Sequence, residues 1–574
     1  MSNHKLFYRG DFDNDKTEAP NRAIVNEAYL NFITGGGWAE TKTFKVLEGV
    51  YTIVGYSLSN YTFIEGETGL IAFDAGGNIG MGKDILAMIR EISDKPIKAI
   101  IYSHHHYTGG ARVYVEEGGA ENVEVYGHPD LDMNIQATTG LLGPMQYRRA
   151  SIQLGMYLPH EGPDAVFGPA EPLFDDPALN ANGHVPVSYP VADGEEVIIE
   201  GIKTVFHHVV ADTRDSLIVH FPDLDLILHN AAIVPNTFPL YTLRGDFYRT
   251  PTEMIAGIDK IRAINPTYMV GCHGTPLISK EEVQDVATAH RDAYAFIYNQ
   301  SVRAINKGMT PDEMANSIRL PQHLDQHPWL YPGYIDNEYS FRGQYRGIVG
   351  WYSEDTAELH PPTPEEFGSV IVEGFGGADQ VIAKAAEAFK EKKYNLTAKL
   401  LSYLISAQPD HQAARQLKAD ALRAMAQTTR SGIQTRNFLT THALHLEGKL
   451  DWTKPPAISF LPDPTTTSVL ATPPGTYLKF LEAQIDPEAS KDLESIVKII
   501  FSDLGQSWAL HVRRGVAEVT EIVPENVDVT LSLPRLEWAQ IVLKETTLLD
   551  ALSSGKATLE GSEETLLAVF NSLD

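Results

Sequence analysis

The sequence predicts an α/β fold that is followed by a helical region and then by a small α+β domain. From residue 46 to about 280, short apolar runs bounded by turn residues alternate with helical periodicity, a pattern typical of sheets covered by helices. Long Ala-rich stretches with helical spacing follow from residue 281, and strands alternate with helices over 468–574. A chain of 574 residues is also too long for a single hydrophobic core.

The first domain contains two sets of expected strands, separated by a turn-rich insertion at 127–190. The first set comprises strands at 46–55, 61–67, 68–77 and 97–103, with a helix at 81–94. The second set comprises strands at 195–208, 216–230 and 266–274, with a helix at 250–264. These elements assign 46–280 to one layered domain. Residues 1–45 are polar and rich in Asn and Gly, and we expect them to form an N-terminal arm.

The remainder of the chain divides at a proline-rich stretch. Residues 281–448 read as helices, two of which are separated by Pro409, because proline ends a helix. Four prolines mark 449–467 as a linker. Beyond it, 508–523 and 527–533 alternate apolar and polar residues as strands do, which predicts an α+β domain over 468–574.

Charge and cysteine content exclude several classes of function. The formal net charge of −29 argues against a nucleic-acid partner, which requires clustered Lys and Arg. The single cysteine, Cys272, excludes disulfide frameworks and multi-cysteine zinc sites. The acidic, polar start does not resemble a signal peptide, and no apolar run is long enough to span a membrane. We therefore expect a cytoplasmic protein without a membrane span, although one cysteine is equally compatible with the periplasm.

Histidines at strand ends predict a metal site. The stretch 102–110, YSHHHYTGG, follows a predicted strand. Alternate residues of an extended segment point the same way, so His104 and His106 can meet at one metal ion. Alone, such a run is equally compatible with a structural role. Further candidates stand at or just past other strand ends, namely His207, His208, Asp212, His229, Asn230, Cys272 and His273.

These residues carry a resemblance to a known family. The segments at 49–77, 102–110, 211–230 and 269–274 resemble the metallo-β-lactamase fold. Those at 146–163 and 235–251, with LYTLRG at 240–245, are similar to the alkyl sulfatases. The resemblance implies an αββα sandwich at 46–280, a helical dimerisation domain at 281–448 and a sterol-carrier-like domain at 468–574. It also implies a homodimer that acts on a small molecule with an apolar chain.

The chain departs from the family's first motif, His-x-His-x-Asp-His before Gly-Gly. Only five residues separate Ser103 from Gly109, so the motif is two residues short. Aligned from the left, His104 and His106 remain and the Asp-His step is lost. Asp212 stands where the family has a carboxylate, His273 matches its last histidine, and His229 or Asn230 falls near its bridging Glu. We therefore expect one divalent metal per chain, zinc rather than iron(II) or manganese.

Three functions remain open. As a hydrolase of alkyl sulfate or related esters, the protein would use metal-bound hydroxide as nucleophile or base. The resemblance then implies that Arg244 binds the sulfate and that Tyr147 assists it. Asp74, which follows a strand, would orient the histidine loop. Without that context, Arg244 reads as a surface ion pair and Tyr147 as a packed tyrosine. Two histidines and one carboxylate equally suit a non-haem iron(II) oxygenase. The third function is a catalytically silent relative that binds apolar ligands.

Overall fold

The computed structural model describes residues 15–38, 40–136, 142–169, 171–454, 456, 466–471 and 473–573. They belong to two compact units, Met1–Asp132 with Gln146–Phe460, and Met133–Met145 with Leu461–Asp574. The first fourteen residues of the expected arm and 457–465 of the expected linker lie outside the described residues.

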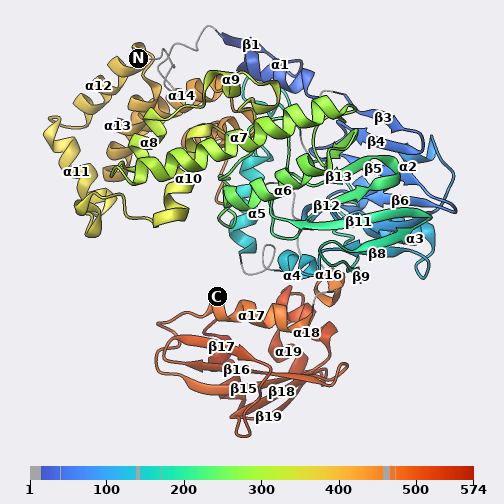
Figure 1. Cartoon of the computed structure of the whole chain (residues 1–574). Coiled ribbons are helices and arrows are strands. Elements are labelled where there is room, and N and C mark those ends of the chain that lie inside the picture. The colour runs from blue at the N-terminus through green and yellow to red at the C-terminus, as the bar shows by residue number, and fades with distance from the viewer. Residues whose placement is uncertain are drawn as a thin grey trace. The chain divides into compact units, whose positions relative to one another are not determined.

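Two β-sheets form the centre of the first unit (Figure 1). The seven-stranded sheet has the order β3 (Lys42–Leu47), β4 (Val50–Val54), β5 (Tyr61–Glu65), β6 (Leu70–Phe73), β7 (Ile97–Ile101), β8 (Glu124–Gly127) and β9 (Tyr189–Pro190). The five-stranded sheet has the order β10 (Glu196–Ile199), β11 (Ile202–Val209), β12 (Ser216–Phe221), β13 (Leu226–His229) and β14 (Tyr268–Gly271). Both sheets mix parallel and antiparallel pairs.

Apolar faces of the two sheets share one core. Phe73 and Ile101 of the first sheet belong to the same buried cluster as Phe206 and Leu228 of the second. The outer face of the second sheet packs, through Ile218 and Ile227, on α6 (Pro251–Ile264) and α7 (Lys280–Ile305). Helix α3 (Ala111–Gly118) packs on β7 of the first sheet, and α2 (Ile79–Arg90) packs on α3. This is the predicted sandwich of two sheets between helices.

The sandwich brings the strand ends that carry the candidate residues together. Strands β6 and β7 are parallel, as are β13 and β14, so the carboxyl ends of each pair lie at one edge. The histidine loop follows β7, and its residues His105–Tyr107 form a 3-10 turn, η2. Asp212 lies in the turn between β11 and β12.

The described part of the expected arm is structured and packed. Residues 15–38 contain strands β1 (Lys16–Glu18) and β2 (Ile24–Asn26) and helix α1 (Glu27–Gly35). Tyr29 and Ile33 of α1 are buried in a small core with Ile433. Within the insertion, α4 (Leu131–Gln136) and α5 (Gly143–Gln153) are helical. The sequence did not reveal α1, because Gly35–Gly37 end its helical periodicity after nine residues.

The region 281–448 is helical, as predicted, and its helices group together beside the sheets (Figure 1). After α7 come α8 (Pro311–Ser317), α9 (Gln322–Asp325), α10 (Asn337–Val349), α11 (Pro364–Gly374), α12 (Ala378–Lys390), α13 (Tyr394–Ala407), α14 (Gln412–Thr428) and α15 (Asn437–Leu446). A five-residue π-helix, η7 (Gly432–Arg436), precedes α15. In the part of the chain that the structure describes, no helix is long and apolar enough to cross a bilayer.

The second unit has an α+β fold of its own. Its sheet has the order β17 (Val516–Thr520), β16 (Gln506–Arg513), β15 (Glu494–Phe501), β18 (Val529–Leu533) and β19 (Thr558–Gly561). Its helices are α16 (Thr466–Ala471), α17 (Pro474–Gln484), α18 (Arg535–Val542), α19 (Leu548–Ser553) and α20 (Glu563–Phe570). Strand β15 alternates buried and partly exposed residues, so one face of the sheet carries the core, which includes Phe501 and Trp508.

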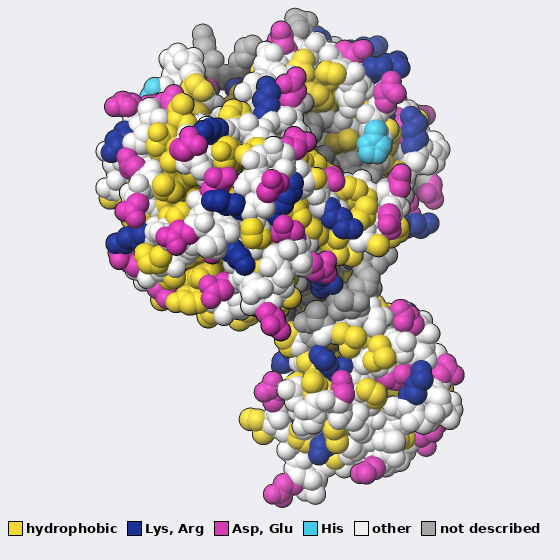
Figure 2. Space-filling view, turned by 90° about the vertical axis from the view of Figure 1, so that its right-hand side faces the viewer, with side chains coloured by type: hydrophobic (Ala, Val, Ile, Leu, Met, Phe, Trp, Pro, Cys, Tyr) yellow, Lys and Arg dark blue, Asp and Glu magenta, His cyan; other side chains and the backbone are white. Residues whose placement is uncertain are grey.

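On the face drawn in Figure 2, the acidic side chains are not gathered into one patch. Asp and Glu side chains are scattered across the face drawn in Figure 2, with Lys and Arg between them. Such a surface holds the charges in water and concentrates neither sign. A site for an anion must therefore create its own positive field.

Candidate active site

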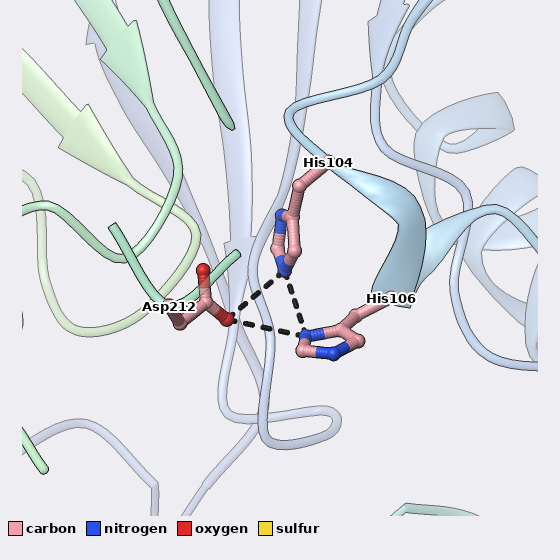
Figure 3. A group of neighbouring side chains, drawn as sticks. All are labelled: His104, His106 and Asp212. Atoms are coloured by element: carbon pink, nitrogen blue, oxygen red, sulfur yellow. Dashed lines mark hydrogen bonds and ion pairs between the residues drawn. The ribbon is translucent and has the colours of Figure 1, made fainter. Parts of the chain in front are cut away.

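Three side chains point their ligand atoms at one another where the two sheets end (Figure 3). His104 Nε2 lies 3.0 Å from His106 Nδ1 and 3.2 Å from Asp212 Oδ2, and His106 Nδ1 lies 3.2 Å from the same oxygen. His104 and Asp212 are buried, and His106 is partly exposed. The structure therefore brings together three of the sequence-predicted ligands.

The spacing of these atoms fits a metal ion. Bonds of about 2.0–2.1 Å to a tetrahedral zinc separate neighbouring ligand atoms by about 3.3 Å, close to the edges of this triangle. Two ring nitrogens and a carboxylate oxygen at such distances repel one another unless a proton or a cation lies between them. Two imidazoles and one carboxylate also form a ligand set that leaves a position open.

The charges in the triad are strongly coupled. Burial raises the pKa of Asp212, but His104 and His106 outweigh it and hold that pKa well below its usual range. Burial lowers the pKa of His104, but Asp212 and the nearby carboxylates raise it above its ordinary value. Burial and the neighbouring His105 lower the pKa of His106 to about 3. One histidine is thus prepared to act as a neutral ligand and the carboxylate as an anionic one.

Asp74 and Ser103 fix the orientation of His104. The backbone N–H of Ser103 donates to Asp74 Oδ1 at 2.8 Å, and the Ser103 hydroxyl lies 2.7 Å from His104 Nδ1. This bond occupies Nδ1 and leaves Nε2 for the metal. Asp74 directly follows β6 and has a left-handed backbone conformation, with a φ of 64°. The position of Asp74 agrees with the expected orienting role. The sequence analysis did not identify Ser103, although it directly precedes the histidines.

The middle histidine points away from the triad. His105 Nδ1 lies 2.9 Å from Asp215 Oδ1, and its backbone N–H donates to Asp215 Oδ2 at 2.9 Å. Asp215 is fully buried. This pair fixes the turn η2 from the opposite side, so that His104 and His106 share one direction.

Asn230 supports the Asp212 carboxylate. Its Nδ2 donates to Asp212 Oδ1 at 2.9 Å and also contacts the Ser216 hydroxyl. Asp212 Oδ1 is thereby engaged while Oδ2 faces the two histidines. Asn230 is fully buried, and its Oδ1 has no hydrogen-bond partner among the described residues.

The other two histidine candidates lie outside the triangle. His273 Nδ1 donates to the Leu58 carbonyl at 2.8 Å, and its Nε2 lies 3.4 Å from the Tyr107 hydroxyl. The ring of Tyr107 packs edge-on against His104 and His273. His229 is buried in β13, where its Nδ1 contacts the Asn230 carbonyl, and burial lowers its pKa to about 4.

A second cluster, which we call the arginine pair, consists of Arg244 and Arg249 around Asp246. Arg244 Nη2 and Arg249 Nη2 donate to the same oxygen, Asp246 Oδ2, at 2.7 and 2.8 Å. Two guanidinium groups on one carboxylate leave one net positive charge. Burial lowers the pKa of Arg244, but the negative charges of Asp246, Tyr334 and Asp212 raise it above its ordinary value. The pair supplies the local positive field that the acidic surface lacks.

Comparison with known proteins decides the family. Residues 54–230 match the metallo-beta-lactamase superfamily, 310–449 the alkyl sulfatase dimerisation domain and 464–574 the alkyl sulfatase C-terminal domain. A linear primary-alkylsulfatase from a Pseudomonas species is 31% identical over 511 residues, covering 87% of this chain and 96% of the relative. The chain belongs to the alkylsulfatase family. The family comparisons favour a hydrolase over the iron(II) oxygenase.

Further members of the alkylsulfatase family agree over nearly the whole chain. An (R)-specific secondary-alkylsulfatase from a Pseudomonas species is 26% identical, covering 98% of this chain and 84% of that protein. The solved structure of a stereoselective inverting sec-alkylsulfatase from a Pseudomonas species superposes with a TM-score of 0.86 at 25% identity, covering 99% and 89% of the two chains. The fold prediction is thereby confirmed for the whole domain order.

Two buried glutamines hold the loop that carries Arg244 in this member of the alkylsulfatase family. Gln153 Oε1 accepts hydrogen bonds from the Thr242 hydroxyl at 3.0 Å and from the Arg244 N–H at 3.3 Å. Gln434 Oε1, from the π-helix, accepts one from the Leu243 N–H at 2.8 Å. Both glutamines are buried. Residues far apart in the sequence therefore fix one arginine.

Tyr147 stays a prediction, since among the described residues no hydrogen bond joins it to Arg244. It lies near Tyr157, whose pKa is raised by burial and by Tyr147. Among the described residues, the side chain on α5 that contacts the Arg244 guanidinium is Gln146, at 3.4 Å. Gln146 and Gln153 are seven residues apart and so share a helix face. That spacing is the one sequence signal that would have identified both glutamines.

Proposed function

We propose that this alkylsulfatase relative hydrolyses sulfate esters of alkyl alcohols with one divalent metal held by His104, His106 and Asp212. The observation that carries the proposal is the convergence of these three ligand atoms. The arginine pair adds to it a net positive charge that suits an anionic substrate. The relatives named above are alkylsulfatases, which supports this substrate class.

Each group has a separate task in this proposal. A divalent cation on the triad would lower the pKa of a water molecule toward neutrality. Arg244 binds the sulfate oxygens, because a guanidinium matches an oxyanion in bidentate fashion. Asp246 keeps that guanidinium in place, and Arg249 keeps Asp246 from neutralising it. Asp74 and Asn230 orient His104 and Asp212, and neither is proposed to touch substrate.

Zinc is the proposed metal. Two imidazoles with one carboxylate and an open position form a common catalytic zinc site, and manganese and iron(II) are the metals to compare. His273 is proposed as an outer contact of the metal site, because its Nε2 lies 3.4 Å from the Tyr107 hydroxyl and its Nδ1 donates to the Leu58 carbonyl. His229 and Asn230 are proposed as structural supports.

The experiment is metal analysis combined with an assay for sulfate release from dodecyl sulfate. We expect about one equivalent of zinc per chain in protein purified without added metal. In His104→Ala, we expect the loss of metal and of nearly all sulfate release. His220→Ala is the matched control, because His220 lies within β12, away from the triad. Full metal content in His104→Ala, or oxygen consumption on turnover, would refute the proposal.

The chain contains the alkyl sulfatase dimerisation region, and we propose a homodimer through its exposed apolar surface. Trp351 and Val370 are 61% and 60% exposed, which is unusual for large apolar side chains. Val370→Glu should produce monomers in analytical ultracentrifugation, whereas Ile522→Glu, at an exposed position of the second unit, should not. Equal dimer populations in the two variants would exclude this surface. We propose the cytoplasm as the compartment, where the buried thiol of Cys272 stays reduced, and the periplasm is the alternative that a single cysteine equally allows.

A further inference from the structure

Arg214 connects the turn that carries Asp212 with the loop that carries the arginine pair. It lies between β11 and β12, two residues after Asp212. Its guanidinium carbon lies 4.9 Å from the centre of the Phe247 ring. Phe247 directly follows Asp246, and its backbone N–H donates to Asp246 Oδ1 at 2.9 Å. One side chain therefore extends from the turn of a triad residue to the carboxylate that both arginines share.

The backbones at both ends of this contact are fixed by other bonds. Asp215, the residue after Arg214, is buried and binds the ring and the backbone N–H of His105, each at 2.9 Å. At the other end, Asp246 is bound by both members of the arginine pair, at 2.7 and 2.8 Å. The Arg214 guanidinium can therefore leave the Phe247 ring while the turn and the loop keep their places.

The charge of Arg214 has no partner of opposite sign. The side chain is exposed, and no carboxylate of the described chain lies within ion-pair distance of its guanidinium. The two carboxylates of its own turn, Asp212 and Asp215, are engaged by the histidines that follow β7. An aromatic face attracts a cation but carries no net charge of its own. The positive charge and the N–H donors of Arg214 are therefore available to an anion.

This charge stands where an anion enters the candidate active site. His106 and Arg244 are partly exposed, whereas His104 and Arg249 are buried, so solvent reaches the triad and the arginine pair through the first two. The chain as a whole has a formal net charge of −29, which repels an anion at a distance. An exposed and unpaired guanidinium beside the loop of Arg244 offsets that repulsion at the entrance.

We propose that Arg214 is the outer anion-binding residue of the active site, which binds the sulfate group of an entering substrate and passes it to Arg244. In the free protein the guanidinium rests on Phe247, and on binding it turns from the ring to the sulfate oxygens, which it can contact in bidentate fashion. The inference rests on the proposed function, because it takes Arg244 as the inner sulfate ligand. Since Arg214 acts before the reaction, it should affect KM and leave kcat unchanged.

The test compares Arg214→Ala with wild type in the full-length, metal-loaded protein at two ionic strengths. At about 0.01 M, where charges act over about 30 Å, KM for dodecyl sulfate should rise about fivefold, as expected for one exposed ion pair. At about 1 M, where charges act over about 3 Å, the two proteins should agree within about twofold. Inorganic sulfate, titrated by calorimetry, should show the same loss of affinity with the same salt dependence. Metal content and kcat should stay constant.

Three further variants serve as controls. Arg303→Ala removes an equal charge from the last turn of α7 and should change neither KM nor sulfate affinity. Arg214→Lys keeps the charge and should retain most of the sulfate affinity at low salt. Phe247→Leu removes the aromatic face but leaves the charge, so its sulfate affinity should stay within about twofold of wild type.

The outcomes separate this inference from the proposed function. Unchanged sulfate affinity in Arg214→Ala at low salt would overturn the inference, even if dodecyl sulfate is cleaved normally. An equal, salt-independent loss in Arg214→Ala and Phe247→Leu would also overturn it, because the contact would then act only by positioning the loop. Wild-type protein that binds sulfate but releases none from alkyl sulfates would refute the proposed function. In that case, a salt-dependent loss of sulfate affinity in Arg214→Ala would still support the inference.

Discussion

The histidines on the two sides of the candidate active site have different partners for their ring nitrogens. On the triad side, His104, His106 and Asp212 leave three ligand atoms facing one another at 3.0–3.2 Å. On the other side, His273 and His229 direct a ring nitrogen to backbone carbonyls, those of Leu58 and Asn230. Similar residue types therefore form ligands on one side and packed hydrogen-bonded groups on the other.

The length of the histidine loop accounts for this difference. With the Asp-His step missing, Tyr107 follows His106 directly, and its ring packs between His104 and His273. Asn230 stands near the expected position of the family's bridging Glu and donates to Asp212 instead of binding a cation. With the motif aligned as in the sequence analysis, hydrogen-bonded groups thus stand where ligands of a second metal are expected.

The largest effect is expected from removing a charge of the triad. Asp212→Asn should lose the metal and reduce kcat/KM by about a thousandfold or more, since loss of an outer contact alone typically costs 10–100-fold. His273→Gln should retain about one metal per chain and lose on the order of tenfold in kcat/KM. Metal analysis and sulfate-release kinetics are measured on both variants. Equal loss of metal in Asp212→Asn and His273→Gln would show that the triad and His273 belong to one metal site.

A buried carboxyl on the side of Tyr107 gives a pH-dependent test. Glu171 is 6% exposed, neither of its oxygens has a described partner, and burial raises its pKa to about 8. Its proton is retained on folding, so stability is full below the unfolded pKa, near 4.5, and falls as pH rises toward 8. Glu171→Gln should remove a loss of up to a few kcal/mol between pH 5 and 8.

Denaturant unfolding of wild type and Glu171→Gln at both pH values measures this difference. Glu161→Gln is the control, because its side chain is 71% exposed. A cation bound near Glu171 would lower its pKa and abolish the pH dependence in metal-loaded wild type. The pH dependence of unfolding in metal-loaded wild type therefore also reports whether a cation is bound near Glu171. Parallel pH profiles in all three proteins would contradict the buried neutral carboxyl.

Asn230→Asp places a second buried carboxylate beside Asp212. Because Asn230 Nδ2 donates to Asp212 Oδ1, the change replaces a hydrogen bond by repulsion between like charges. The metal-free protein should lose about 2 kcal/mol of unfolding free energy. Asn230→Ala, which removes the bond without adding charge, is the matched control and should lose less. If added zinc raises the metal content of Asn230→Asp to two zinc ions per chain, then the length of the histidine loop is not what prevents a second metal from binding.

The sequence was sufficient for the fold and for three candidate side chains that the structure brings together, and it failed where contacts are long-range. Apolar periodicity located the sheets and helices, and the alternation of His104 and His106 indicated their common direction. It could not place Tyr334 or Gln434, because their contacts to Gln153 and Leu243 span 181 and 191 positions. Tyr147 illustrates the same limit: its motif lies near the site, but the helix face presents Gln146 and Gln153 instead.

The smallest effect should come from the π-helix contact to the arginine loop. Gln434→Leu removes the acceptor of the Leu243 N–H, so the loop that carries Arg244 gains freedom while the guanidinium keeps Asp246. Loss of one neutral hydrogen bond, about 1 kcal/mol, should raise KM for an alkyl sulfate about fivefold, with kcat and metal content nearly unchanged. Gln434→Glu keeps an oxygen acceptor and should restore most of the KM. A fall in kcat without a change in KM would instead place Gln434 in support of the triad, and the two charged clusters would then respond as a single unit.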